Sequence, residues 1–256
     1  MQAAILYDYN TPLVVENLDL NEPAEGEVLV KIKAAGICHS DWHAIKGDWP
    51  WVNLPIIPGH EVSGIVEEVG ENVLTLKPGD HVILTWKPGC GECEMCIKGH
   101  PAVCDKMPVT SALPKIRGSG NNINKLVGLG GFGTYTVIPE HAAVLVDKDV
   151  PFPQKALVGC AVTTGVGSVI NTAKVIPGSS VAVFGCGGVG LNCIQGANIA
   201  GATTIIAVDL LNDKLEMAKQ FGATHVINAS KENPVEIIRE FTDGEGVHYA
   251  FEAIGV

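Results

Sequence analysis

The chain has 256 residues, of which 46% are hydrophobic and 18% are charged, and its formal net charge is −11. The length allows two domains of ordinary size, and the composition is typical of a folded globular protein. No apolar run approaches the roughly 18 residues that span a bilayer. The negative net charge disfavours binding to nucleic acid and to anionic membranes, because both attract basic surfaces. We therefore expect no nucleic-acid or membrane partner.

Up to about residue 150, β-branched runs alternate with turns that contain Pro and Gly. This pattern is typical of an antiparallel, barrel-like β domain. The predicted strands cover residues 28–35, 61–69, 81–84 and 134–138. Residues 107–125 show little periodicity and are predicted to form a surface loop.

Four cysteines in this region follow the spacing C-x2-C-x2-C-x7-C, namely Cys90, Cys93, Cys96 and Cys104. Close thiolates on a turning loop supply the four soft donors that a tetrahedral zinc ion needs. An iron–sulfur run would prefer a short last gap followed by Pro. A disulfide knot is disfavoured, because the chain opens without a signal peptide and we therefore expect a reducing, cytoplasmic location. The spacing predicts a structural zinc site.

From about Ser179 the pattern changes to alternating strands and helices, which predicts a parallel, doubly wound sheet. The predicted strands are 180–184, 203–208, 225–227 and 247–251, and the predicted helices are 188–200, 212–221 and 234–242. The sequence stops soon after the last strand, which would leave an apolar sheet edge uncovered. We therefore expect an α/β domain that is truncated at its C-terminus.

A glycine-rich turn follows the first of these strands and opens the first helix. Gly185-Cys-Gly-Gly-Val-Gly190 matches G-x-G-x-x-G, and Asp209 ends the next strand. Such a turn places a pyrophosphate at a helix N-terminus, while the carboxylate accepts hydrogen bonds from the ribose hydroxyls. A carboxylate would repel a 2′-phosphate, so the pattern favours NAD over NADP. A helix N-cap is the alternative role for Asp209.

Three further residues carry zinc-ligand chemistry, and each lies at the edge of a predicted element: Cys38, His60 and Cys160. Two cysteines and one histidine with an open fourth position would form a catalytic zinc site rather than a structural one. A lone Cys or His is more often a packing residue. Spacing alone does not bring these three together.

Taken together, these motifs resemble those of the zinc-dependent medium-chain alcohol dehydrogenases over essentially the whole chain. The matching motifs are Cys38-His-Ser-Asp41, Gly59-His60-Glu61, the four-cysteine run, Gly159-Cys160, Gly185–Gly190 and Asp209. The resemblance implies a GroES-like β domain over residues 1–161, followed by an incomplete Rossmann NAD-binding domain over residues 162–256. The sequence is similar to the class III, formaldehyde dehydrogenase-like branch and to the nicotinoprotein branch.

The resemblance also implies two zinc ions per chain, NAD(H), and roles for individual residues. Cys38, His60 and Cys160 would hold the catalytic zinc, and the four-cysteine run the structural one. Glu61 matches a carboxylate that approaches the catalytic metal, and Asp41 a partner that orients His60. Ser40 and His43 match a proton relay. The cofactor-binding positions are His39, Thr164, Gly185, Gly187, Gly188, Val189, Gly190, Asp209 and Lys214.

The implied reaction is oxidation of a primary or secondary alcohol to an aldehyde or ketone, with zinc as Lewis acid and hydride transfer to NAD⁺. We expect a small alcohol or aldehyde substrate, a homodimeric or homotetrameric parent protein, and poor turnover by a truncated chain. Three tryptophans either line the substrate pocket or pack in the apolar core: Trp49, Trp51 and Trp86. Two alternatives stay open: a glutathione-dependent formaldehyde (S-(hydroxymethyl)glutathione) dehydrogenase, and a zinc- and nucleotide-binding truncated protein without catalysis.

Overall fold

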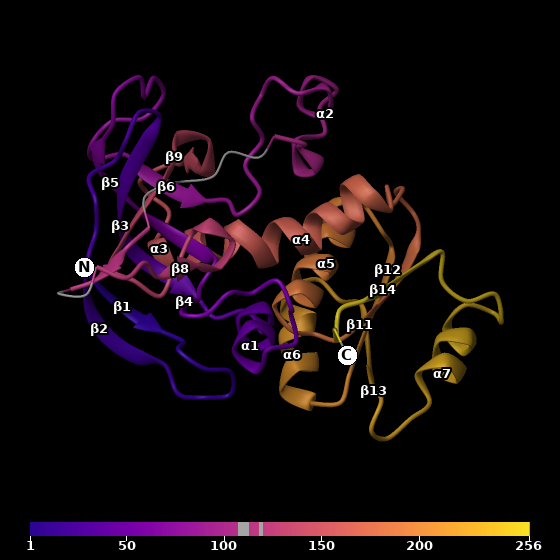
Figure 1. Ribbon diagram of the computed structural model, residues 1–256. Helices are drawn as coiled ribbons and strands as arrows, with labels where there is room; N and C mark the ends of the chain where they lie inside the picture. The colour runs from indigo at the N-terminus through magenta and orange to yellow at the C-terminus, as the bar shows by residue number, and fades with distance from the viewer. Residues whose placement is uncertain (107–112, 118–119, 256) are drawn as a thin grey trace. The chain divides into compact units, whose positions relative to one another are not determined.

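The computed structural model describes residues 1–106, 113–117 and 120–255 (Figure 1). Its contacts divide the chain into two compact units, Met1–Cys160 and Ala161–Val256. Each unit has hydrophobic cores of its own. Within the described ranges, no helix is long and apolar enough to cross a membrane.

The first unit is built on a five-stranded antiparallel sheet in the order β10-β6-β5-β3-β9. Its strands are β3 (Glu27–Gly36), β5 (Glu61–Val69), β6 (His81–Leu84), β9 (Tyr135–Pro139) and β10 (Ala143–Leu145). Valine and leucine side chains from these strands share one buried core, which includes Val28, Val30, Val62, Val66, Val82 and Leu84. The predicted antiparallel β domain is confirmed, and four of its strands lie within one residue of the predicted bounds.

Two small sheets complete the β structure of this unit. One joins β1 (Gln2–Ile5), β2 (Val14–Asp19) and β7 (Lys115–Ile116), and the other pairs β4 (Ile56–Ile57) with β8 (Asn124–Lys125). The prediction of a surface loop over 107–125 was therefore wrong where β7 and β8 lie within its described part. Strands of two residues are too short to show an alternating pattern. Residues 107–112 and 118–119 of that loop lie outside the described residues.

Short helices of the first unit connect its strands. They are α1 (His39–Lys46), α2 (Glu94–Ile97) and α3 (Phe152–Leu157). Helix α1 begins where β3 ends, and α3 packs against β3, β5 and β6. After α3 the chain continues as a π-helical segment, η4 (Val158–Val162), which carries Cys160. Single π-helical turns are rare and frequently occur at functional sites.

The second unit contains a four-stranded parallel sheet in the order β13-β12-β11-β14. The strands are β11 (Ser180–Phe184), β12 (Thr204–Asp209), β13 (His225–Asn228) and β14 (Tyr249–Glu252). The helices are α4 (Thr163–Gly167), α5 (Gly188–Ile199), α6 (Asn212–Gln220) and α7 (Pro234–Phe241), with a π-helical turn, η5 (Ser168–Thr172), after α4.

Both faces of this parallel sheet are covered, which confirms the doubly wound arrangement. Alternate residues of β11 enter two different cores: Val181 and Val183 pack with Leu215 of α6, whereas Ala182 packs with Ile238 of α7. Every strand and helix predicted for this unit is present, with ends that differ by at most two residues, as is common at frayed element ends.

Candidate metal centres and cofactor-binding turn

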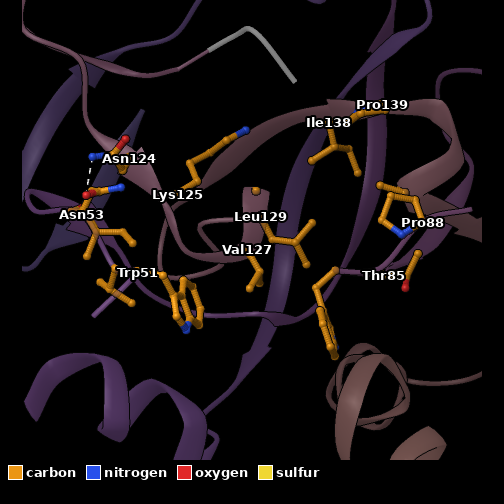
Figure 2. A pocket seen from close by; sticks show the side chains of 15 residues that line it. Trp51, Asn53, Thr85, Pro88, Asn124, Lys125, Val127, Leu129, Ile138 and Pro139 are labelled. Carbon is orange, nitrogen blue, oxygen red and sulfur yellow. Dashed lines mark hydrogen bonds between the residues drawn. The ribbon is translucent and has the colours of Figure 1, made fainter. Parts of the chain in front are cut away.

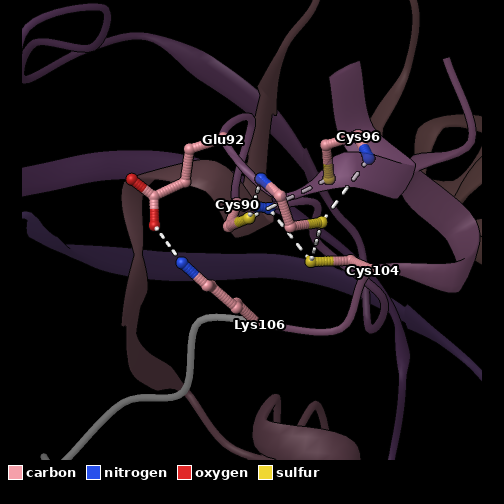
Figure 3. A network of polar contacts seen from close by, with 6 residues as sticks. Cys90, Glu92, Cys96, Cys104 and Lys106 are labelled. Atoms are coloured by element: carbon pink, nitrogen blue, oxygen red, sulfur yellow. Dashed lines mark hydrogen bonds and ion pairs between the residues drawn. The ribbon is translucent and has the colours of Figure 1, made fainter. Parts of the chain in front are cut away.

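The four cysteines of the spaced run surround one point in the structure (Figure 3). Their ligand atoms all lie within 4.8 Å of one another, with 4.0 Å between the sulfurs of Cys90 and Cys96 and 3.8 Å between those of Cys93 and Cys104. Four sulfurs about 2.3 Å from a tetrahedral zinc ion would lie about 3.8 Å apart. The four thiols therefore fit a closed, structural zinc site.

Backbone N–H groups of the same loop donate to these sulfurs. Cys93 N donates to Cys90 Sγ at 3.3 Å, and Cys96 N donates to Cys93 Sγ at 3.5 Å. The backbone hydrogen bond from Cys96 lowers the pKa of Cys93 to about 6. Thiolates are the form that binds metal, so the loop favours the ligand form of this residue before any ion arrives. Glu92 and Lys106 form an exposed ion pair beside the cluster (Figure 3).

A second metal-ligating cluster lies elsewhere in the first unit. Ligand atoms of Cys38, His60, Glu61 and Cys160 all lie within 4.8 Å of one another. Cys38 precedes α1, His60 and Glu61 lie at the start of β5, and Cys160 lies in η4. The fold thus brings together three residues that the sequence placed at the edges of separate elements. Two thiols and an imidazole are the donor set of a catalytic zinc site that keeps an open position.

Asp41 connects three parts of this cluster, although it is only 1% exposed. One carboxylate oxygen accepts hydrogen bonds from Gly59 N at 2.9 Å and from His60 Nδ1 at 3.1 Å. The other oxygen accepts from Cys38 N at 3.0 Å. Because Nδ1 of His60 is engaged by this carboxylate, Nε2 is the ring nitrogen left to face a metal.

Hydrogen bonds within the cluster shift the pKa values of Cys38 and His60 in opposite directions. A hydrogen bond from Cys160 to the sulfur of Cys38 is the largest contribution that lowers the pKa of Cys38 to about 4, and further hydrogen bonds from His60 and Ser40 act against the effect of burial. Burial lowers the pKa of His60, but hydrogen bonds to Asp41 and Cys38 outweigh it and raise the pKa to about 10. The lowered pKa of Cys38 favours the thiolate, which is the form that binds metal.

For two glycines of this site, Gly59 and Gly36, the sequence predicted no functional role. Gly59 has a φ of +92°, and a Cβ there would lie 2.7 Å from Phe132 N. The Pro-Gly turn in the sequence was the signal for the positive φ, but nothing local shows that the Gly59 N–H serves Asp41. Gly36 ends β3 directly opposite Glu61 of β5, a pairing that only the sheet register reveals.

The predicted relay residues lie on α1. His39 and His43 have ring centroids 4.9 Å apart, and Nδ1 of His43 lies 2.7 Å from Oδ2 of Asp48. The side chain of His43 is 29% exposed, so it reaches solvent. Ser40 contacts Cys38 through its side chain and its backbone. Ser40 therefore lies beside the metal-ligating cluster, and His43 lies at the surface of the same helix.

The glycine-rich turn of the second unit has the open backbone that a dinucleotide needs. Gly185 has a φ of +91°, and a Cβ on Gly190 would lie 1.8 Å from Gly185 O, so both positions require glycine. A Cβ on Gly187 would meet no atom within 4 Å, which leaves an open approach to the backbone at the N-terminus of α5. These features fit a pyrophosphate. Burial raises the pKa of the Cys186 thiol to about 11, which suits a packing role.

Asp209 ends β12 and faces the turn. Its Oδ2 accepts a hydrogen bond from Cys186 N at 2.8 Å, and its Oδ1 accepts one from Leu211 N at 3.0 Å. Burial acts to raise the pKa of this carboxyl, but the backbone hydrogen bonds and the charge of Lys214 hold it below its ordinary value. Lys214 Nζ lies 4.0 Å from Asp209 Oδ2. In dinucleotide-binding folds of this kind, a carboxylate at the end of the second strand accepts hydrogen bonds from the ribose hydroxyls.

Thr164 and Val189 lie on neighbouring helices of the second unit. Thr164 is exposed on α4, and its carbonyl accepts a hydrogen bond from Ser168 Oγ at 2.6 Å. Val189 lies in the first turn of α5 and packs partly against the core. Helix α4 approaches α5 closely, because a Cβ on Gly165 would lie 2.5 Å from Val189 O. The structure thus places these two predicted residues near each other.

A cavity of about 270 Å³ opens in the first unit (Figure 2). Trp51, Trp86, Val127 and Leu129 supply apolar walls, with Asn53, Asn124 and Lys125 as polar groups. Trp49 is absent from this lining and stacks on Trp51 instead, with ring centroids 4.9 Å apart. The metal-ligating cluster is not part of the described lining either. The cavity therefore does not by itself place a substrate.

Comparison with family models matches both units. Residues 24–148 match the model described as alcohol dehydrogenase GroES-like domain, and residues 188–256 match the model described as zinc-binding dehydrogenase. The two matches cover separate parts of the chain, one in each compact unit.

Solved structures agree with these matches. An alcohol dehydrogenase zinc-binding domain protein from Burkholderia ambifaria is 38% identical with a TM-score of 0.92, and benzyl alcohol dehydrogenase from Acinetobacter calcoaceticus is 40% identical with a TM-score of 0.89. Each alignment covers 100% of this chain and 70% of the other. A structure described as NAD-dependent alcohol dehydrogenase is 30% identical with a TM-score of 0.82, covering 98% of this chain and 70% of that one.

Proposed function

Because this chain belongs to the medium-chain, zinc-dependent alcohol dehydrogenases, we propose that it oxidises a primary or secondary alcohol to the aldehyde or ketone, with NAD⁺ as hydride acceptor. The observation that carries the proposal is the cluster of two half-buried thiols and a buried imidazole, which is held by Asp41 and is separate from the four-cysteine site. A protein that used zinc only as a structural brace would need no second cluster.

Cys38, His60 and Cys160 would hold the catalytic zinc, and Cys90, Cys93, Cys96 and Cys104 the structural one. When bound at the first site, zinc supplies Lewis-acid polarisation of an alcohol oxygen. Asp41 fixes the imidazole ring of His60, since its carboxylate accepts from Nδ1 at 3.1 Å. Glu61 offers a further oxygen donor within the same cluster. The roles of these residues follow from donor chemistry and the family.

NAD(H) would be held by the glycine-rich turn of the second unit. The open backbone above Gly187 and the N-terminus of α5 suit the pyrophosphate, and the Asp209 carboxylate suits the ribose. When bound, the nicotinamide supplies the hydride acceptor. Thr164, Val189 and Lys214 complete the proposed cofactor site of this unit. His39 is proposed as a cofactor-binding residue from the family motif alone.

Release of the alcohol proton is assigned to α1. Ser40 contacts Cys38 and so lies beside the site, where its hydroxyl can accept and pass on a proton. The half-buried side chain of His43, which contacts Asp48 and still reaches solvent, suits the solvent end of such a relay. We further assign the protein to the cytoplasm, in line with eight cysteines that are all free thiols in the structure, and its full-length parent to a homodimer or homotetramer.

The test is NAD⁺ reduction by the zinc-loaded chain with ethanol, benzyl alcohol and a secondary alcohol, each with and without glutathione. Oxidation of a free alcohol supports the proposal, and oxidation of formaldehyde only with glutathione would assign the protein to the glutathione-dependent branch. Cofactor released only on denaturation would identify a nicotinoprotein. Binding of zinc and NADH without oxidation of any alcohol would instead support a non-catalytic binding protein.

A further inference from the structure

Helix α3 leads directly into the segment that carries Cys160, and it is tied to the central sheet at two places. At its start, Ser63 Oγ of β5 donates a hydrogen bond to Phe152 O at 2.7 Å. At its far end, a Cβ on Gly159 would lie 2.8 Å from Leu84 O, so the segment passes close to the end of β6. The position of Cys160 therefore depends on how residues 152–159 lie along β5 and β6.

Between these two points lies a contact of two titratable side chains, Lys155 of α3 and His81 at the start of β6. Lys155 is only 1% exposed, and its Nζ lies 3.0 Å from His81 Nδ1. The same Nζ lies 4.9 Å from the centroid of the Phe152 ring, which packs on His81 with ring centroids 4.7 Å apart. His81 Nδ1 therefore serves as a hydrogen-bond acceptor for this amine.

An ammonium group has donors only, so this contact needs a His81 whose Nδ1 carries no proton. Burial lowers the pKa of His81, and the charges of Lys155 and Lys148 lower it further, against an opposing effect of Asp80. Because the folded-state pKa is depressed, the contribution of neutral His81 is complete above its unfolded pKa of about 6.5 and is lost as the pH falls through the folded value.

We propose that Lys155 and His81 are positioning residues for Cys160, and that their contact makes metal binding at the catalytic site sensitive to mild acid. Protonation of His81 removes the acceptor of Lys155 and sets two positive charges side by side in a covered position. Helix α3 then loses its tie to β6, and the Cys160 thiol loses its fixed place beside Cys38 and His60. This inference rests on the proposed metal site, but it concerns metal affinity and not turnover.

The first test compares the wild-type chain with His81→Asn. The amide oxygen of Asn replaces the Nδ1 acceptor and does not titrate between pH 5 and 8. Both chains are loaded with Co²⁺, and the ligand-field absorption of the catalytic site is followed during competition with a chelator. We expect equal affinity within about twofold at pH 7.5, and at pH 5.5 about tenfold weaker binding by the wild type than by His81→Asn, in the range typical of groups that orient metal ligands. Acid protonates the metal ligands in both chains to the same extent. A difference in metal affinity between the two chains therefore reports the protonation of His81.

The second test removes the donor with Lys155→Met. We expect weaker metal binding at the catalytic site already at pH 7.5, and no extra loss near the pKa of His81. Lys33→Met, an exposed lysine of β3, is the matched control and should behave like the wild type. Retention of metal by the four-cysteine site shows in each sample that the unit is folded.

Superimposable metal-retention curves of the wild type, His81→Asn and Lys155→Met from pH 5.5 to 8 would overturn the inference, even if the chain oxidises alcohols. Conversely, a chain that shows the expected differences in metal affinity but oxidises no alcohol would overturn the proposed function and leave this inference intact. A wild-type chain that binds no metal through Cys38, His60 and Cys160 at pH 7.5 would overturn both.

Discussion

Gly36 of β3 lies directly opposite Glu61 of β5, and a Cβ on Gly36 would come 2.1 Å from Glu61 Oε2. The Glu61 carboxylate therefore occupies the space that any other residue at position 36 would fill. Since Glu61 belongs to the cluster of Cys38, His60 and Cys160, the glycine allows a carboxylate to lie next to the metal ligands. A backbone feature of one strand thus shapes the metal site on its neighbour.

The first prediction concerns this space. Gly36→Ala forces Glu61 to move and should lower the free energy of unfolding by about 1–3 kcal/mol, as overpacking in a buried position does. It should also alter the Co²⁺ spectrum of the catalytic site. The cost should be smaller in a Glu61→Ala background, because the nearest clashing atom is then absent. Equal costs in both backgrounds, measured by denaturant unfolding, would contradict this account.

Asp41→Asn tests the residue that connects three parts of the site. An amide cannot accept from Cys38 N, Gly59 N and His60 Nδ1 together, because one of its two polar atoms is a donor. We expect catalytic-site metal affinity to fall about 10–100-fold, the range typical of such partners, while the four-cysteine site keeps its metal. Asp19→Asn, an exposed carboxylate, should change neither affinity. Chelator competition on the two-metal chain measures both sites in one sample.

Asp209 is predicted to decide between NAD and NADP. Its carboxylate should repel a 2′-phosphate, so Asp209→Asn should bind NADH about tenfold more weakly and discriminate less against NADPH, a tenfold change being about 1.4 kcal/mol. Asp213→Asn, an exposed residue of α6, is the control. Calorimetric titration with both cofactors provides the measurement, and an unchanged NADH-to-NADPH affinity ratio would count against the role of Asp209.

Glu140 provides a pH-dependent prediction away from the metal sites. Burial acts to raise its pKa, but hydrogen bonds from Thr75 and Leu74 outweigh this and hold the pKa below its ordinary value of 4.5. The folded-state pKa is depressed, so the carboxylate contributes stability above about pH 4.5, and this contribution is lost as the pH falls through the folded value. Glu140→Gln should cost about 1.5–3 kcal/mol at pH 7 and progressively less as the pH falls below about 4.5, as measured by urea unfolding. A cost that does not change with pH would contradict this reasoning.

The sequence predicted long, regular elements well and tertiary relationships poorly. The alternation of strands and helices after Ser179 predicted the parallel sheet correctly, because each apolar run is long enough to show its periodicity. Strands β4, β7 and β8 have two residues each and depend on pairing with distant segments, so no local pattern marks them. Helix α3 begins at a Pro-rich stretch and has only six residues, and it depends on packing against the distant strands β3, β5 and β6.

The metal sites differ in the same way. The four-cysteine site could be predicted from the sequence, because all four ligands lie on one loop and their spacing is typical of a zinc site. The second site draws its ligands from three separate segments, which carry Cys38, His60 and Cys160. In the sequence, only the resemblance to a known family joins them. Gly36, His81 and Lys155 left no signal at all, since their importance depends on sheet register and on the packing of α3.

The zinc content of the purified chain and of two variants tests directly whether the protein holds two separate metal centres. We predict two zinc ions in the wild type, one in Cys160→Ser and one in Cys104→Ser, with the ion of Cys160→Ser held by the four-cysteine site. A wild-type chain that holds a single zinc, unchanged in Cys160→Ser, would show that Cys38, His60 and Cys160 form no metal centre and would contradict the account.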